Sequence, residues 1–282
     1  MGDADDALMV AVLEHEGHEV SWHLWDEAEL DWGGFDVVVV RSTWDYQRRR
    51  DEFLRWAERV PVLRNPAPVL AWNTDKRYLA ELGPEGIAAI ETTYLPPGSL
   101  LPPGGNKEPD GLAAGEVVIK PTVSAGSKDT ARFDLSDPAA VARAEALTAE
   151  IHGGGRTAMV QPYISSVDEQ GETALLYFGG EFSHAIGKGP LLRPGEGPTE
   201  GFFAPETVEP REATAAELAL GAKVAKAIAS RFGDLLYARV DLVAGDRGEP
   251  IVLEVELTEP SLFFAHSEGA ARRFAQALPY SL

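Results

Sequence analysis

The chain has 282 residues, of which 44% are hydrophobic and 25% charged, as is typical of a globular protein with a substantial core. Its formal net charge of −20 argues against binding to nucleic acids or anionic membranes, because both require clustered cations. The absence of cysteine excludes disulfides, a thiolate nucleophile and zinc sites with sulfur ligands. No apolar run reaches the ~18 residues of a transmembrane helix, and the first six residues carry no basic side chain. We therefore expect a cytoplasmic protein.

The first third of the chain alternates predicted helices and strands. The sequence pattern predicts helices at residues 7–16 and 51–60 and a strand at residues 19–25. The β-branched run 35–41 predicts a parallel strand that is buried on both faces. We expect a small open α/β layer with residues 41–46 at its ligand-binding edge. Because a strand would ordinarily precede the first helix, we expect this layer to lack its first strand.

Lys120 ends an apolar run and precedes a loop of small residues at 122–130. The run fixes the direction of the lysine, and small residues such as Ser124, Gly126 and Ser127 let backbone amides approach an anion closely. The pattern therefore predicts a phosphate-binding loop. The alternative is a surface lysine before a turn.

The remaining segments alternate predicted strands and helices with two loops rich in proline and glycine, at 96–111 and 187–205. The second loop is expected to be a lid or an insert. The predicted strands are 159–164, 173–178, 236–243 and 251–257, and the predicted helices are 138–150, 213–232 and one at the end of the chain.

Four charged residues share a face of the predicted hairpin near the end of the chain. Strand alternation places Arg239 beside Asp241 and Glu254 beside Glu256. If the turn is centred on residues 247 and 248, Asp241 lies opposite Glu254. Such carboxylates repel one another unless a cation such as Mg²⁺ is bound between them. The alternative is a solvent-facing side of an edge hairpin.

In this order, the segments resemble the ATP-grasp superfamily from about residue 35 onward, whereas P-loop, Rossmann and serine-hydrolase motifs are absent. The resemblance implies an α/β (α+β) fold in which two subdomains, 73–158 and 159–282, clasp ATP behind an N-terminal layer at 1–72. The implied ATP contacts are Lys76, Lys120, Ser124, Gly126, Ser127, Gln161, Tyr163, Ile164 and Asp168, the last on the ribose. The implied metal ligands are Asp241, Glu254 and Glu256, with Arg239 and Lys188 as catalytic cations and Arg41, Trp44 and Ser261 as substrate contacts.

Within the superfamily, segments 41–46, 73–79 and 254–262 resemble the branch that contains the cycloserine-forming synthetase, whose ATP-binding region is similar to that of prokaryotic glutathione synthetase. One departure is Glu256, since the last metal position in D-alanine–D-alanine ligase is often asparagine. The branch implies an ATP-dependent carboxylate–amine ligase that acts through an acylphosphate on a small amino-acid-like substrate. It implies two Mg²⁺ ions, with Mn²⁺ as an alternative. An intramolecular cyclase, a nucleotide-binding protein without ligase activity and a homodimer are left open.

Overall fold

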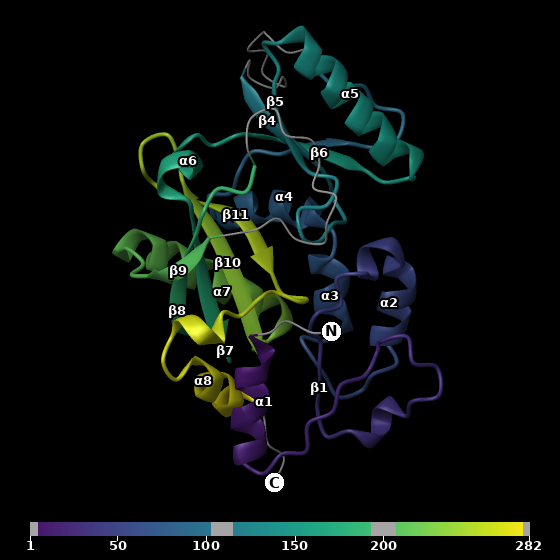
Figure 1. Cartoon of the computed structure of the whole chain (residues 1–282), viewed down its shortest axis with the longest axis vertical. Coiled ribbons are helices and arrows are strands. Elements are labelled where there is room, and N and C mark those ends of the chain that lie inside the picture. Colours follow the sequence, from purple (N-terminus) through teal and green to yellow (C-terminus); the bar gives the residue numbers. More distant parts are fainter. Residues whose placement is uncertain (1–4, 103–114, 193–206, 279–282) are drawn as a thin grey trace.

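The computed structural model describes residues 5–102, 115–192 and 207–278 (Figure 1). The helices are α1 (Asp6–His15), α2 (Arg50–Ala57), α3 (Ala67–Asn73), α4 (Leu79–Leu82), α5 (Pro138–Gly153), α6 (Ser166–Gln170), α7 (Ala215–Phe232) and α8 (Ala270–Ala277). The strands are β1 (Val38–Val39), β2 (Leu63–Arg64), β3 (Thr93–Leu95), β4 (Glu116–Pro121), β5 (Ala131–Asp134), β6 (Ala158–Pro162), β7 (Glu172–Phe178), β8 (Glu181–Lys188), β9 (Val208–Arg211), β10 (Tyr237–Ala244) and β11 (Pro250–Glu256).

Two antiparallel sheets form the body of the molecule. A four-stranded sheet has the order β3-β6-β4-β5, and a five-stranded sheet has the order β11-β10-β7-β8-β9. In Figure 1, the four-stranded sheet and α5 lie at the top, the five-stranded sheet lies at the centre, and α2, α3 and β1 lie at the lower right. The domain boundary predicted at residue 159 falls within β6, although β6 pairs with β3 and β4.

The five-stranded sheet is covered on both faces. Helix α7 packs Val224 against Leu175 and Val240 of the sheet, and its start is fixed by a capping box between Thr214 and Glu217. On the opposite face, Phe274 of α8 packs in the cluster that contains Tyr237. Because strand side chains alternate, the residues of β10 that follow Tyr237 on this face are Arg239 and Asp241. The core thus ends where these charges begin.

The predicted helices of the first third form, but the predicted strands do not form as expected. Residues 19–25 are not a strand, and only Val38–Val39 of the run 35–41 pairs, in parallel with β2. A cavity of about 900 Å³ lies among α1, residues 18–23 and residues 34–41. This cavity lies beside β1, where a neighbouring strand would have to pair. Within the described residues, segment 19–25 therefore has no strand to pair with. Three buried atoms of cavity-lining residues have no hydrogen-bond partner in the described structure: Thr43 Oγ1, Trp56 Nε1 and Arg64 Nε.

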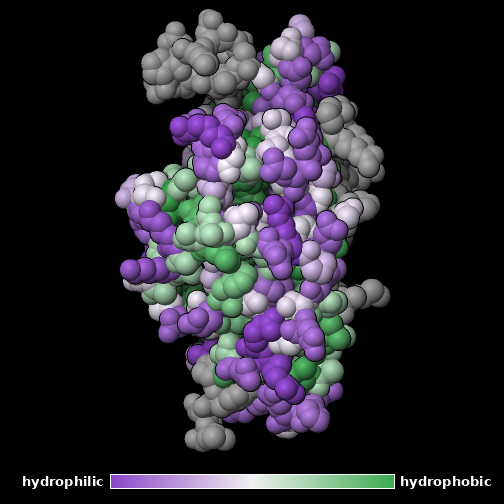
Figure 2. Space-filling model, turned by 90° about the vertical axis from the view of Figure 1, so that its left-hand side faces the viewer, coloured by the Kyte–Doolittle hydropathy of each residue, from purple (hydrophilic) through white to green (hydrophobic). Residues whose placement is uncertain are grey.

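The elements of the rest of the chain agree closely with the sequence patterns. The predicted helices at 138–150 and 213–232 are α5 and α7, and the predicted terminal hairpin is β10–β11. Most of the two predicted loops, 96–111 and 187–205, lies outside the described residues, which exclude 103–114 and 193–206. Among described helices, none has the length and apolar character needed to cross a membrane. Figure 2 shows hydrophilic residues over much of one face, around a hydrophobic stretch near its middle.

Candidate active site

A cavity of about 250 Å³ is lined by residues of both sheets and by residues 44 and 46 of the N-terminal part. It contains all of the predicted site residues except Asp168 and Arg41. Among described residues, its charged lining consists of Lys76, Lys120, Lys188, Arg239, Glu172, Asp241, Glu254, Glu256 and Glu259. We refer to this cavity as the cleft.

The hairpin β10–β11 brings its charged residues together as predicted. Asp241 pairs with Glu254 and Arg239 pairs with Glu256 in the antiparallel register. The register shifts immediately after Asp241, and beyond that point Leu242 lies opposite Val252. The predicted register is therefore confirmed on the cleft side of this irregularity.

Two lysines from different elements converge on Glu254. The Nζ atom of Lys76 lies 3.0 Å from Glu254 Oε1, and that of Lys120 lies 3.8 Å from Glu254 Oε2. Burial opposes ionisation of Glu254, but the two lysines hold its pKa below the ordinary value. Burial also lowers the pKa of Lys120, with Glu254 opposing that effect. Lys76 Nζ additionally donates to the Ser124 carbonyl at 2.9 Å, so it connects the hairpin to the small-residue loop.

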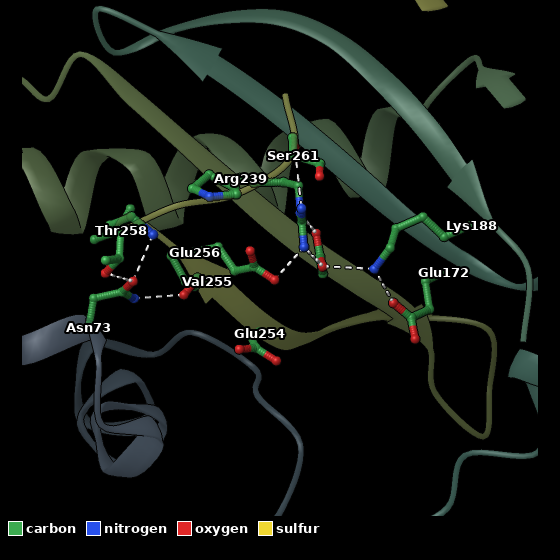
Figure 3. Close-up of polar contacts among 12 residues, drawn as sticks. Asn73, Glu172, Lys188, Arg239, Glu254, Val255, Glu256, Thr258 and Ser261 are labelled. Carbon is green, nitrogen blue, oxygen red and sulfur yellow. Dashed lines mark hydrogen bonds and ion pairs between the residues drawn. The ribbon is translucent and has the colours of Figure 1, made fainter. Parts of the chain in front are cut away.

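A second ion-pair group surrounds Asp241 and includes Arg239, Lys188 and Glu172, which Figure 3 shows. Arg239 donates to both Asp241 oxygens at 2.9 and 3.0 Å. Lys188, at the end of β8, donates to Asp241 at 3.0 Å and to Glu172 at 2.8 Å. Burial would raise the pKa of Asp241, but Arg239 and Lys188 lower it to about 2. Asp241 is therefore ionised at neutral pH.

Glu256 and Glu259, the two other carboxyl groups near the hairpin, are harder to ionise than Asp241 and Glu254. Arg239 forms an ion pair with Glu256, yet burial and repulsion from Glu254 and Asp241 raise the pKa of Glu256 to about 7. Burial and repulsion from Glu256 raise the pKa of Glu259 to about 8. Additional positive charge at this place would therefore lower the free energy of the cleft.

The donor set fits a divalent cation bound together with phosphates. In the described part of the chain, no group of three or more carboxylate or histidine side chains is already close enough to hold a metal ion. Asp241, Glu254 and Glu256 are instead each paired with lysine or arginine. Carboxylate oxygens are the protein ligands that Mg²⁺ prefers, and Mg²⁺ commonly completes its coordination with phosphates and water. The pairing cations are themselves suited to phosphate oxygens.

Asn73 fixes the position of β11. Its side-chain amide donates to the Val255 carbonyl at 2.7 Å, and its side-chain oxygen accepts from Leu257 N at 2.7 Å and from the Thr258 hydroxyl at 3.1 Å (Figure 3). The Tyr78 hydroxyl donates to the same Val255 carbonyl at 2.8 Å. These buried contacts hold Glu254 and Glu256, on either side of Val255, in the cleft.

The end of the cleft formed by β6 contains Gln161, Tyr163 and Ile164. Gln161 is buried and donates to the Thr92 hydroxyl at 3.0 Å. The structure places Asp168 outside the cleft lining, where its carboxylate accepts from Arg132 at 3.0 Å and from the Tyr163 hydroxyl at 2.6 Å. The Arg132 guanidinium also lies 3.4 Å from the centre of the Tyr163 ring. This arrangement does not support the expected ribose contact of Asp168.

The opposite end of the cleft is formed by the N-terminal part and the segment after β11. Trp44 and Ser261 line it as expected. Arg41 does not; its buried guanidinium donates to Asp6 at 2.7 and 2.9 Å and to the Pro260 carbonyl at 2.5 Å. Arg41 therefore holds the 259–261 segment and lies outside the cleft lining, which does not support the expected substrate contact.

Sequence reasoning missed several lining residues, namely Tyr46, Glu172, Glu259 and Phe263. Glu172 begins a predicted strand and lies beside Lys188 only because β7 and β8 pair. Glu259 was within the segment that carries the family resemblance, and its position three residues after Glu256 was the available signal.

Known proteins similar to this chain share its length and fold. Residues 1–66 match the family model of the N-terminal domain of the D-cycloserine synthetase DcsG. The cycloserine biosynthesis protein DcsG of Streptomyces lavendulae is 40% identical over 276 residues, which cover 90% of this chain and 86% of that protein. The crystal structure of D-cycloserine synthetase DcsG superposes with a TM-score of 0.84 at 37% identity, covering 97% of this chain and 93% of the other.

More distant structures show the fold alone. A D-alanine–D-alanine ligase from Bacillus anthracis complexed with ATP has a TM-score of 0.62 at 15% identity, with 98% of this chain and 92% of the other covered. A RimK domain ATP-grasp protein from Sphaerobacter thermophilus has a TM-score of 0.64 at 16% identity, and the match covers 98% of this chain and 96% of the other. The predicted α+β ATP-grasp fold is confirmed. The chain therefore belongs to the family of the cycloserine biosynthesis protein DcsG and has the ATP-grasp fold.

Proposed function

We propose that this chain uses ATP and Mg²⁺ to form an amide bond within a single amino-acid-like molecule, in a ring closure of the cycloserine-forming type. As a member of the DcsG family, the chain is an ATP-dependent ligase. The observation that carries the proposal is the cleft, in which one hairpin and two lysines gather the charges that MgATP chemistry requires. Identity of 40% to a cycloserine biosynthesis protein across 90% of the chain favours cyclisation over joining two molecules.

Lys76 and Lys120 are proposed to bind phosphate oxygens. In the structure they are held by Glu254 at 3.0 and 3.8 Å, and a phosphate would take over these cations while Glu254 turns to a metal ion. Asp241, Glu254 and Glu256 would hold Mg²⁺, proposed as two ions with Mn²⁺ as an alternative, and the bound metal would offset phosphate charge. Ser124, Gly126 and Ser127 belong to the loop whose backbone amides would approach the phosphates.

Arg239 and Lys188 are the proposed catalytic cations. They lie on either side of Asp241, where they would stabilise negative charge that develops as the substrate carboxylate attacks the terminal phosphate. Attack gives an acylphosphate and ADP, and the amine then displaces phosphate from the activated carbonyl carbon. Positioning and charge stabilisation supply the catalysis, so no side-chain nucleophile is required.

Gln161, Tyr163 and Ile164 are proposed to line the adenine site, because they occupy the β6 end of the cleft. Asp168 is left out of the proposed ATP contacts, since Arg132 and Tyr163 engage its carboxylate. Trp44 and Ser261 are proposed to contact the substrate at the other end. The proposed setting is cytoplasmic, with small molecules rather than nucleic acid or membrane as partners, in keeping with the net charge of −20.

The test is product formation from a single substrate. The purified protein is incubated with MgATP and the open-chain aminooxy amino acid obtained by hydrolysing the ring amide of D-cycloserine. We expect cycloserine and ADP in equal amounts without a second amine. ADP formation that depends on a second amine would indicate an intermolecular ligase. MgATP binding without ADP release across a panel of amino acids would indicate a nucleotide-binding protein without this activity.

A further inference from the structure

Glu259 differs from every other charged residue of the described cleft lining in forming no close ion pair, although the charges of Lys76 and Arg239 act on it from a distance. Glu172, Asp241, Glu254 and Glu256 each form an ion pair with lysine or arginine. Within the described residues, Glu259 forms neither a hydrogen bond nor an ion pair, although it lines the same cavity. A partly buried carboxylate without a partner is costly unless a ligand supplies the opposite charge.

The backbone on both sides of Glu259 is fixed by buried side chains. Before it, the Thr258 carbonyl accepts from the Tyr237 hydroxyl at 2.7 Å, and the Thr258 hydroxyl donates to Asn73. After it, the Pro260 carbonyl accepts from Arg41 at 2.5 Å. Such anchoring places the carboxylate in advance, which a recognition residue requires because little ordering is then needed on binding.

The surroundings of Glu259 suit an organic cation better than a metal ion. The same end of the cleft is lined by Trp44, Tyr46 and Phe263. Burial raises the pKa of the Tyr46 hydroxyl most, and the nearby charge of Glu259 raises it further. Aromatic rings beside a carboxylate favour an ammonium group. The Tyr46 ring stacks on Phe53 and the Arg239 guanidinium lies 5.6 Å from the centre of the Phe263 ring, so Trp44 is the ring assigned to the ligand. Mg²⁺ and Ca²⁺ require several oxygen ligands, and Glu259 lies beyond β11, outside the hairpin register that places Asp241 opposite Glu254.

We infer that Glu259 binds the ammonium group of the substrate amino acid that does not react and is retained in the product. This inference rests on the proposed function, since it presumes an amino-acid-like substrate. With this assignment, the adenine would lie at the β6 end of the cleft, the phosphates at Lys76 and Lys120, and the substrate amine at Glu259. Without a ligand, burial and the charge of Glu256 raise the pKa of this carboxyl group, and Lys76 and Arg239 offset only part of that rise.

The test compares Glu259→Gln with the wild-type protein in steady-state kinetics. Loss of one charge-assisted contact should raise KM for the open-chain aminooxy amino acid by roughly 10- to 100-fold, with kcat and KM for ATP nearly unchanged. Glu259→Asp keeps the charge, so its KM for the aminooxy amino acid should lie between those of the wild-type protein and Glu259→Gln. Glu181→Gln is the control, because Glu181 is exposed at the start of β8 and does not line the cleft.

A substrate analogue with hydrogen in place of the retained amino group gives a second readout. The wild-type protein should discriminate against this analogue, and Glu259→Gln should lose most of that discrimination. Unchanged KM with retained discrimination would overturn the inference, as would a rise confined to KM for ATP or a fall confined to kcat. If the wild-type protein forms no product from the parent compound, the proposed function itself has failed, and that result is visible before any variant is compared.

Discussion

Glu254 is the residue on which the proposed phosphate and metal contacts converge. Replacing it by alanine removes a proposed metal ligand and leaves Lys76 and Lys120 without their shared counter-ion. We expect Glu254→Ala to lower magnesium-dependent ATP turnover by at least roughly 100-fold, the scale expected for losing a major electrostatic contribution. Coupled measurement of ADP release, with circular dichroism to verify folding, checks this.

The matched control for that variant is Glu249→Ala. Glu249 is exposed and lies just before β11 of the same hairpin, outside the cleft lining. Its replacement should leave turnover within about twofold, as expected of a surface position. A folded Glu254→Ala protein with wild-type turnover would contradict the metal assignment.

Arg41 illustrates a residue whose role the structure revises. It is buried with Asp6 as its ionic partner, so Arg41→Gln should cost roughly 3 kcal/mol in the free energy of unfolding by breaking a buried ion pair. Asp6→Asn combined with Arg41→Gln should recover most of that loss. Urea unfolding of the single and double variants measures both effects. Wild-type stability together with lost substrate binding in Arg41→Gln would restore Arg41 as a substrate contact.

At the scale of elements, His184 joins β8 to the segment that follows β11. Its ring contacts the Leu262 carbonyl at 3.1 Å and the Ser183 hydroxyl at 2.9 Å. Burial, and to a lesser extent the nearby charge of Arg273, lowers the pKa of His184 to about 4. Between pH 6.5 and 4 the unfolded chain therefore binds a proton that the folded protein does not, so stability falls as pH falls through this window.

We expect this effect to reach up to roughly 3 kcal/mol at the acidic end. The slope of unfolding free energy against pH should be smaller in His184→Gln than in the wild-type protein. His15→Gln, at an exposed position of α1, should keep the wild-type slope. Equal slopes in all three proteins would show that His184 titrates alike in the folded and unfolded states.

Elements with their own strong local patterns were predictable from the sequence. The hairpin register at Asp241 and Glu254 follows from strand alternation and turn length. The β-branched run 35–41 suggested a long strand, but strand length depends on the neighbour, and β1 pairs only over Val38–Val39. The contacts of Arg41 and Asp168 could not be predicted, because each depends on where distant segments meet.

At the scale of the whole molecule, buried polar contacts tie the N-terminal part to the five-stranded sheet. Asn65 donates to the Tyr237 and Leu257 carbonyls at 2.8 Å, and the Tyr237 hydroxyl, which donates to Thr258, also lies 3.0 Å from the Val40 carbonyl. These contacts hold the segment that carries Trp44 and Tyr46 against the end of the hairpin. The proposed substrate end of the cleft thus depends on both parts of the chain.

In the proposed reaction, this molecule activates a substrate carboxylate with the terminal phosphate of ATP. Transfer of oxygen tests it most directly. The aminooxy amino acid is labelled with ¹⁸O in its carboxyl group, and the phosphate released during turnover is analysed by mass spectrometry. An acylphosphate requires that one labelled oxygen appear in phosphate for each cycloserine formed. Product formation with unlabelled phosphate would contradict carboxylate activation and with it the proposed roles of the cleft residues.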